Sequence, residues 1–348
     1  MTNLNEFYDD STPMRPRKKK RTGLMVLLGA IALVLIAVLA ASGYLFSLAR
    51  TFDKNATKLE NVFPAESLRP EVPQEAKGAV NILLLGNDTR ATDNGDENFA
   101  SLPNGGRSDT MMLVHIPADR KGIYVTSIMR DTWLDIPGHG KAKVNAAFAY
   151  GGVSLAVQTL EGLFDTRIDH VAAIDFEGFK GLTDALGGVE INNPIAFQQN
   201  VKNGIKFPQG VQTLNGEEAL AFVRERYAFK DGDYQRVRNQ QLYIKAVLNT
   251  MLSKDTLTDP AKISESIKEL APFIAVDDTL DSLKVAKLGA SMTGIRSNDM
   301  NFFTLPNKGT GRSADGQSIV IPDMAVIGEF SKALKADKVG QFVEDNNL

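Results

Sequence analysis

Residues 22–49 contain no charged side chain, and residues 24–41 are almost wholly Leu, Val, Ile, Ala, Met and Gly. A helix needs about 20 such residues to cross the hydrocarbon core of a bilayer, so this run is long enough to span one. Six Lys and Arg residues lie at positions 15–21, directly before it. Because basic residues stay on the cytoplasmic side of a span, we expect a cytoplasmic N-terminus and export of everything after Arg50.

A cleaved signal peptide is the alternative interpretation of this segment, because the sequence LAAS at 39–42 offers small residues near its end. The apolar core of a signal peptide usually has about 7–15 residues, which favours an uncleaved anchor here. The predicted organisation is a basic cytoplasmic tail at 1–22, a transmembrane signal-anchor helix at 23–48, an extracytoplasmic linker at 49–77 and a catalytic domain at 78–348.

The balance of charges excludes several classes of function. Residues 1–22 carry six Lys and Arg against three acids, which leaves 33 Lys and Arg against 39 Asp and Glu for the rest. A mildly acidic body argues against a general nucleic-acid surface. The absence of Cys excludes disulfide scaffolds, thiol catalysis and Cys-ligated zinc. Three His residues argue against a His-rich metal site, but a hard metal ion held by carboxylates stays open.

Short apolar runs alternate with helical patterns after residue 78. The run AVNILLLG at 79–86 ends in Gly and fits a strand buried on both faces. Asn215, followed by two acids, fits a capped helix start. Strand alternating with helix predicts an α/β sheet covered by helices on both faces. Further strands are predicted at 110–116, 122–128, 169–175 and 188–191, helices at 153–164, 176–186 and 235–252, and apolar runs of the same domain at 301–305 and 318–321.

Polar side chains gather at the ends of the predicted strands. The first strand runs into Asp88, and a Gly-rich acidic loop then leads to Arg107 and Asp109, directly before the next strand. The third strand runs into Arg130. In open α/β sheets, ligands bind in the crevice beyond the carboxyl ends of the strands. This edge of the sheet is therefore the predicted location of a site.

A second group of polar residues follows along the chain: Arg224, Arg226, Asp233, Arg236 and Gln240. Arg236 and Gln240 are four residues apart and share one face of the predicted helix, whereas Arg238 points elsewhere. Guanidinium groups bind phosphate oxygens in a bidentate way and stay charged at any working pH. Two carboxylates can hold Mg²⁺ together with the phosphates of a substrate. The combination fits a pyrophosphate site.

Structural interpretations compete with this one. Each of these spacings, taken alone, is more common on a solvated face of a protein. Arg130 followed by Asp131 also fits a local turn or a structural ion pair, and Asn145 fits a helix cap. Core or structural roles are expected for Trp133, Phe176, Phe179 and His115.

Six segments resemble the LytR–CpsA–Psr family, in the family's order and behind its usual single N-terminal anchor. One such motif alone is weak evidence for the family, but six in the same order are specific to it. Together the matches span about residues 79 to 245. The segments are NILLLGNDTR (81–90), RSDTMML (107–113), SIMRDT (127–132), KVNAAFAYGG (143–152), DHVAAIDFEGFKGLTDALGGVEI (169–191) and LNGEEALAFVRERYAFKDGDYQRVRNQ (214–240).

The resemblance implies a three-layer α/β/α domain around a central mixed β-sheet, with an apolar tunnel for a polyprenyl chain. It also implies an Mg²⁺-dependent phosphotransferase. Such an enzyme moves a glycopolymer from a polyprenyl-pyrophosphate carrier to a sugar hydroxyl of peptidoglycan, forms a phosphodiester and releases polyprenyl phosphate.

Family roles transfer to this sequence by position. Asp88 and Asp109 match the metal-binding acids, and Asp233 and Gln240 match two further polar positions of the site. The pyrophosphate-binding arginines correspond to Arg107, Arg130, Arg224, Arg226 and Arg236. Our hypothesis assigns catalysis to Arg130, Arg107 and Asp233.

Two departures from the family pattern matter. The family often has Arg directly before the equivalent of Gln240, where this chain has Asn239, with Arg238 one place earlier. The loop 91–106 is also long. Two alternative functions stay open, a non-catalytic polyprenyl-phosphate-binding or regulatory membrane protein, and the same transferase acting on a protein acceptor.

Overall fold

The computed structural model describes residues 52–54, 56–87, 108–251 and 271–348, all within one compact unit, Leu48–Leu348. The predicted cytoplasmic tail and the anchor at 23–48 lie outside these residues. Within the described ranges, no helix is both long and apolar enough to span a membrane.

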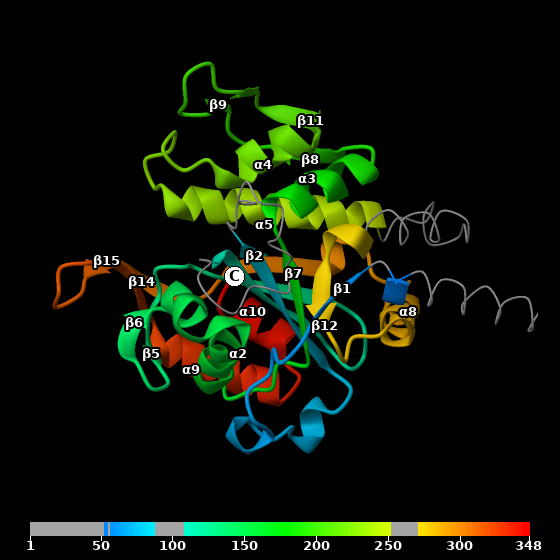
Figure 1. Ribbon diagram of the computed structural model, residues 1–348, viewed down its shortest axis with the longest axis vertical. Helices are drawn as coiled ribbons and strands as arrows, with labels where there is room; N and C mark the ends of the chain where they lie inside the picture. Colours follow the sequence, from blue (N-terminus) through cyan, green and yellow to red (C-terminus); the bar gives the residue numbers. More distant parts are fainter. Residues whose placement is uncertain (1–51, 55, 88–107, 252–270) are drawn as a thin grey trace, which may run out of the picture. The chain divides into compact units, whose positions relative to one another are not determined.

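A mixed seven-stranded sheet forms the centre of the unit (Figure 1). β2 runs parallel to β7, and β4 runs parallel to β13, whereas β3 is antiparallel to both of its neighbours. The carboxyl ends of β2, β4, β7 and β13 and the amino end of β3 therefore share one edge. In spatial order the strands are β1 (Thr57–Leu59), β12 (Ala275–Asp277), β7 (His170–Ile174), β2 (Val80–Asn87), β3 (Ser108–Ile116), β4 (Ile123–Ile128) and β13 (Met300–Thr304).

Helices cover both faces of this sheet because successive side chains of a strand point to opposite faces. Leu83 and Leu85 of β2 pack in the core formed with α2, α9 and α10. Ile82 and Leu84 pack on the other side, against residues of α5 and α8. Figure 1 shows α5 on one side of the strands and α2, α9 and α10 on the other. The helices are α2 (Val144–Phe164), α5 (Asp233–Met251), α8 (Ser282–Ser291), α9 (Met324–Lys335) and α10 (Val339–Asp345).

A small lobe packs against α5, and Tyr243 and Val247 of α5 lie in its core. Asn215 caps α4 as predicted, since its side chain accepts a hydrogen bond from the backbone of Glu218, which in turn accepts one from the backbone of Asn215. The lobe contains α3 (Phe176–Ala185), α4 (Gly216–Arg224), β8 (Val189–Asn193), β9 (Phe197–Gln198), β10 (Lys206–Phe207) and β11 (Gly210–Leu214).

Two predicted strands lie outside the central sheet. The run at 188–191 forms β8, which pairs only with β11 within the described residues. The run at 318–321 forms β15 (Ser318–Pro322), which pairs with β14 (Asn307–Arg312) in a hairpin. A short apolar run identifies a strand but not its partner, because partner choice depends on residues distant in sequence.

α2 begins nine residues before its predicted start. It runs from Val144, and a kink at Gly151 and Gly152 interrupts it, with Gly152 at φ 63° and ψ −156°. Asn145 is the second residue of the helix, whereas Lys143 occupies the N-cap position. The interpretation of Asn145 as the cap was therefore wrong. Its backbone N–H instead donates to the carbonyl of Arg130 at 3.2 Å.

Residues assigned to the 49–77 linker take part in the fold. β1 pairs in parallel with β12 at one edge of the sheet, and Val62 is buried in the main core. Arg69 donates to the buried carboxylate of Glu161 at 2.7 Å and to the carbonyl of Ile168. The folded unit thus includes residues that precede position 78.

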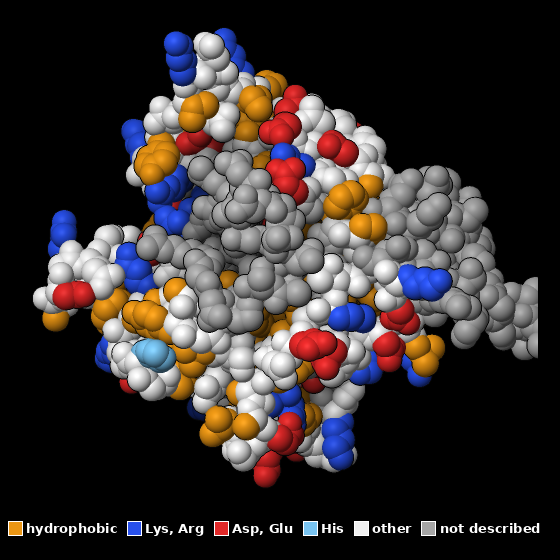
Figure 2. All heavy atoms as spheres, in the orientation of Figure 1, with side chains coloured by type: hydrophobic (Ala, Val, Ile, Leu, Met, Phe, Trp, Pro, Cys, Tyr) orange, Lys and Arg blue, Asp and Glu red, His pale blue; other side chains and the backbone are white. Residues whose placement is uncertain are grey.

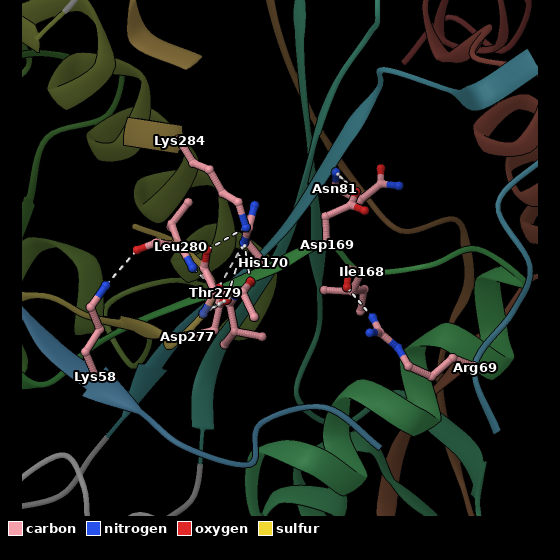
Figure 3. A network of polar contacts seen from close by, with 11 residues as sticks. Lys58, Arg69, Asn81, Ile168, Asp169, His170, Asp277, Thr279, Leu280 and Lys284 are labelled. Atoms are coloured by element: carbon pink, nitrogen blue, oxygen red, sulfur yellow. Dashed lines mark hydrogen bonds and ion pairs between the residues drawn. The ribbon is translucent and has the colours of Figure 1, made fainter. Parts of the chain in front are cut away.

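A buried carboxylate ties β12 to β7 (Figure 3). Asp277 is fully buried and accepts hydrogen bonds from the backbone N–H groups of Val171, Thr279 and Leu280, each at 3.0 Å. The Nδ1 atom of His170 lies 3.1 Å from the same carboxylate. This network lies at the amino end of β7, whereas the predicted site residues gather at its carboxyl end.

Candidate active site

A cavity of about 480 Å³ lies between the sheet and the helices α3, α4 and α5. Its walls come from β2, β3 and β7 on the sheet side and from the three helices on the other. The predicted site edge of the sheet contributes Gly86, Thr110 and Ile174, at the ends of three neighbouring strands. Ligand binding at this edge is expected for an open α/β sheet.

Four arginines from three segments line one part of this cavity. Arg130 follows β4, Arg224 and Arg226 lie at the end of α4, and Arg236 projects from the first turns of α5. Gln240, one helical turn after Arg236, lines the same wall. Figure 2 shows Lys and Arg side chains gathered at the end of α5 where that helix begins. The fold thus brings together residues up to 110 positions apart in the sequence.

A single carboxylate joins three of these arginines. One oxygen of Asp233, Oδ2, lies 3.3 Å from Nε of Arg130 and 3.2 Å from Nη2 of Arg236. The other, Oδ1, lies 3.4 Å from Nη1 of Arg226. Asp233 is the first residue of α5, so the start of this helix fixes the relative positions of the three guanidinium groups.

The site carries an excess of positive charge in partly desolvated surroundings. The side chain of Arg236 is only 7% exposed and that of Arg130 only 18% exposed. Arg224 stacks over the ring of Phe176, with its Cζ atom 4.1 Å from the ring centroid. Cations held away from bulk water attract anions more strongly than exposed ones. Four guanidinium groups around one shared carboxylate therefore favour a ligand with several negative oxygens.

Apolar side chains line the rest of the cavity. Along α5 the lining residues Arg236, Gln240, Tyr243 and Ile244 share one helical face, so the wall changes from polar to apolar with distance from the arginines. Burial raises the pKa of Tyr243 to about 12, and its hydroxyl lies 2.7 Å from that of Thr183. Apolar lining residues on the other walls include Leu84, Met112, Ala172, Ile174, Phe179 and Ile274.

The resemblance implied an apolar tunnel, but sequence reasoning named none of the apolar side chains that line this cavity. Phe176 and Phe179 were expected in the core; Phe179 does pack against the core of the small lobe, but both residues also line the cavity. The spacing from Arg236 along α5 was the available signal for Tyr243 and Ile244, since residues four, seven and eight positions apart share a helix face.

The described residues of the predicted site set come together, and Arg238, which was not assigned to the site, lies elsewhere as expected. Arg130, Arg224, Arg226, Arg236 and Gln240 line the cavity, and Asp233 contacts three of these arginines. Arg238 instead donates to Gln235 and pairs with Asp231, and it lines a different groove. Arg238 thus provides no replacement for the Arg that the family often has directly before Gln240.

The structural alternatives have mixed outcomes. Arg130 does approach Asp131, at 4.0 Å, but Asp131 lies closer to Lys143, at 3.1 Å. His115 has the predicted structural role, because its ring nitrogens lie 2.8 Å from Asn81 and 3.1 Å from Asp337.

The predicted metal ligands fall largely outside the described residues. Asp88 and Arg107 lie outside them entirely, and of Asp109 the structure describes only the backbone, within β3. Asn87, which precedes Asp88, pairs with Ser108, which precedes Asp109. Within the described ranges, no three acidic or His side chains cluster as a metal site. The role of the two acids as metal ligands therefore stays a prediction.

Comparison with known proteins identifies relatives along most of the chain. The model of the LytR_cpsA_psr family matches residues 44–336. The chain is 30% identical over 314 residues to the polyisoprenyl-teichoic acid–peptidoglycan teichoic acid transferase TagU of Enterococcus faecalis, covering 89% of this chain and 95% of the relative. It is 34% identical to TagU of Oceanobacillus iheyensis, covering 87% and 90%. It is 29% identical to the cell wall biosynthesis protein LcpA of Corynebacterium glutamicum, covering 91% and 67%.

Solved structures share the fold. Bacillus subtilis TagV superposes with a TM-score of 0.64 at 26% identity, covering 75% of this chain and 98% of TagV. TagT bound to LIIa-WTA superposes with a TM-score of 0.59 at 25% identity, covering 81% of this chain and 98% of that protein. The predicted α/β fold with a central mixed sheet is thereby confirmed.

Proposed function

The chain belongs to the LytR–CpsA–Psr family, and from that premise we propose that it is a membrane-anchored transferase of cell-wall glycopolymers. Its donor is a glycan linked to a polyprenyl pyrophosphate, and its acceptor is a sugar hydroxyl of peptidoglycan. The bond formed is a phosphodiester. The TagU relatives are named for the transfer of polyisoprenyl-linked teichoic acid to peptidoglycan, which supports this substrate class.

The observation that carries the proposal is the division of the cavity into two chemical halves. Arg130, Arg226 and Arg236 surround Asp233 at one part of it, and apolar side chains line the remainder. A polyprenyl pyrophosphate has the same division, with a doubly charged headgroup on a hydrocarbon chain. A soluble sugar nucleotide leaves the apolar wall unused.

The proposed reaction is an attack by the acceptor hydroxyl oxygen on the phosphorus attached to the donor sugar. The bond between that phosphorus and the bridging oxygen breaks, polyprenyl phosphate leaves, and the proton of the acceptor hydroxyl passes to the solvent. Phosphoryl transfer depends mainly on positioning and on neutralisation of charge. The arginines of this chain supply both, and Arg130 is assigned to stabilise the charge that develops in the transition state. Arg107, which precedes β3, is assigned to the same group.

Asp233 is assigned a positioning role. Both of its oxygens lie within ion-pair distance of guanidinium groups, at 3.2–3.4 Å. A carboxylate that contacts three guanidinium groups holds them close together although their charges repel one another. Asp233 thus holds the arginines in a fixed arrangement before the donor binds.

Mg²⁺ is proposed as the cofactor, held by Asp88 and Asp109. Asn87 and Ser108, which precede these acids in the sequence, pair with each other at the site edge, and this pairing supports the assignment. When bound, the ion neutralises charge on the phosphate oxygens of the donor. Residues 23–48 are proposed as the anchor, with the basic tail in the cytoplasm and the catalytic domain outside, which positions the site near a membrane-borne donor.

Release of polyprenyl phosphate tests the proposal directly. The full chain in detergent is incubated with a short polyprenyl-pyrophosphate glycan and peptidoglycan glycan strands, with and without Mg²⁺. Arg130→Ala should lower the rate by roughly 100- to 1000-fold, as expected for loss of one donor to developing charge. Its melting temperature should stay near that of the wild type. Lys332→Ala, on the exposed face of α9, is the matched control and should keep full activity.

Two outcomes would contradict parts of this proposal. Normal transfer by Arg130→Ala would exclude Arg130 from the mechanism. Tight binding of the donor without any release, in the presence of Mg²⁺ and acceptor, favours the non-catalytic binding protein instead.

A further inference from the structure

A second groove, of about 540 Å³, lies on the other side of α5 from the cavity. One wall consists of Gln235, Arg238, Asn239, Leu242 and Lys245, which share a single face of the helix. Arg236 and Gln240, on another face of the same turns, line the cavity. The two hollows are therefore built on opposite sides of one helix. Pro194, Ile195 and Leu348 contribute to the other walls, together with β13.

Polar groups without partners are available in this groove. The half-buried Lys245 has no acidic side chain within ion-pair distance among the described residues, and the side-chain amide of Asn301 has no hydrogen-bond partner among them. Both side chains are partly exposed, so they can contact a ligand in the groove without giving up a contact within the protein. The unmatched ammonium group of Lys245 favours an anionic ligand.

The charges and the hydrogen-bonding groups of the groove extend along its length. Arg238 and Lys245 are seven residues apart, which corresponds to about 10.5 Å along the helix axis. β13 forms the edge of the central sheet and pairs only with β4 within the described residues. Its outer edge therefore presents backbone N–H and C=O groups beside Asn301. Cationic, amide and backbone groups at intervals along the groove suit an extended polar chain rather than a compact ion.

We propose that this groove binds the acceptor as a glycan strand that carries carboxylate and N-acetyl groups. Arg238 and Lys245 contact its carboxylates, and Asn301 and the edge of β13 contact its amide and hydroxyl groups. Gln235 of the groove and Arg236 of the cavity are consecutive residues at the start of α5, and the proposal places the reacting end of the glycan strand at this end of the helix. The inference rests on the proposed function for the identity of the acceptor, but the groove can be tested separately.

The test measures binding of soluble, uncrosslinked peptidoglycan glycan strands to the full chain in detergent, with no donor present. Arg238→Ala combined with Lys245→Ala should weaken binding at least tenfold. The charge-preserving pair, Arg238→Lys with Lys245→Arg, should bind within about threefold of the wild type. Lys332→Ala, on the opposite face of the sheet, is the matched control and should bind normally. In the transfer assay, the alanine pair should raise KM for glycan strands and leave kcat near normal.

Three results would overturn the proposal: no binding of the strands by the wild type, equal binding by the alanine pair, or equal loss in the charge-preserving pair. Failure of the groove and failure of the proposed function give different patterns. If the wild type binds glycan strands through Arg238 and Lys245 but shows no transfer, the result supports the proposed binding groove and contradicts the proposed transferase function. If the alanine pair transfers with an unchanged KM for glycan strands, the result supports the transferase function and contradicts acceptor binding in the groove.

Discussion

Asp277 shows how a single buried charge can stabilise the sheet. Burial raises the pKa of this carboxyl, but hydrogen bonds from His170, Thr279 and the backbone of Val171 outweigh that effect, and the pKa lies below its ordinary value of 3.8. Asp277→Asn removes the charge and leaves N–H donors facing an amide. We expect a loss of about 1–3 kcal/mol in the free energy of unfolding at about pH 7.

The pH dependence of this loss has a definite sign. Because the folded-state pKa is lowered, the carboxylate contributes stability above its ordinary pKa and loses it as the pH falls through the folded-state value. The difference between wild type and Asp277→Asn in denaturant unfolding should therefore shrink below about pH 4. Asp278→Asn, at the exposed neighbouring position, should change stability by less than about 0.5 kcal/mol. A constant difference at all pH values would contradict this account.

At the same scale, the charged residues of the site could be predicted and the apolar ones could not. Arg130 and Arg236 stand out in the sequence because charges at strand ends and on helix faces are distinguishable by position alone. Ile174 and Ile244 cannot be told from core residues in the sequence. A residue lines a cavity only when no other side chain fills the space beside it, and the sequence does not show this. Arg238 could be excluded from the cavity by helical periodicity, but the groove that it lines depends on β13, about 60 residues away in the chain.

At the scale of elements, the kink in α2 explains why the sequence placed the helix start too late. Adjacent Gly residues usually end a helix, but here Gly151 and Gly152 interrupt one that continues on both sides. Gly152 is buried with φ 63° and ψ −156°, a region of backbone space that is essentially restricted to Gly. The packing of residues 144–150 against the sheet and the β5–β6 hairpin (Trp133–Ile136 and Gly140–Lys143) sustains the first half of the helix.

Two glycines of this one helix should respond in opposite ways to the same substitution. Gly152→Ala should lower the free energy of unfolding by about 1–3 kcal/mol, because Ala cannot adopt that backbone conformation without strain. Gly162 is exposed, has ordinary helical geometry, and has open space around an added Cβ. Gly162→Ala should therefore raise the stability by about 0.5–1 kcal/mol. Denaturant unfolding of both variants checks the pair, and equal effects would mean that the kink stores no strain.

At the scale of the whole molecule, the layered architecture could be predicted from alternating strands and helices, but its N-terminal boundary could not. Residues 56–77 are polar and contain three prolines, a composition typical of a linker. Their place in the fold depends on distant partners, namely β12 for β1 and Glu161 for Arg69. A short strand and a single arginine leave no periodic signal that a sequence pattern can detect.

Removal of this segment should therefore destabilise the entire unit. In a chain that begins at residue 78, Glu161 keeps the N–H of Ile168 but loses Arg69, and a carboxylate that is 1% exposed is left without its cation. Removal of one partner from a buried ion pair costs about 3–5 kcal/mol. The fragment 78–348 should accordingly melt at least about 5 °C below the fragment 52–348.

Arg69→Met in the longer fragment separates the ion pair from the rest of the segment. This variant keeps β1 and most of the apolar contact of the side chain, so it should reproduce much of the loss in melting temperature. Glu66→Gln is the matched control, because Glu66 pairs with Arg167 at an exposed position and exposed pairs contribute little. Equal melting temperatures for the two fragments would show that residues 52–77 do not unfold together with the sheet, and activity assays could then use the shorter chain.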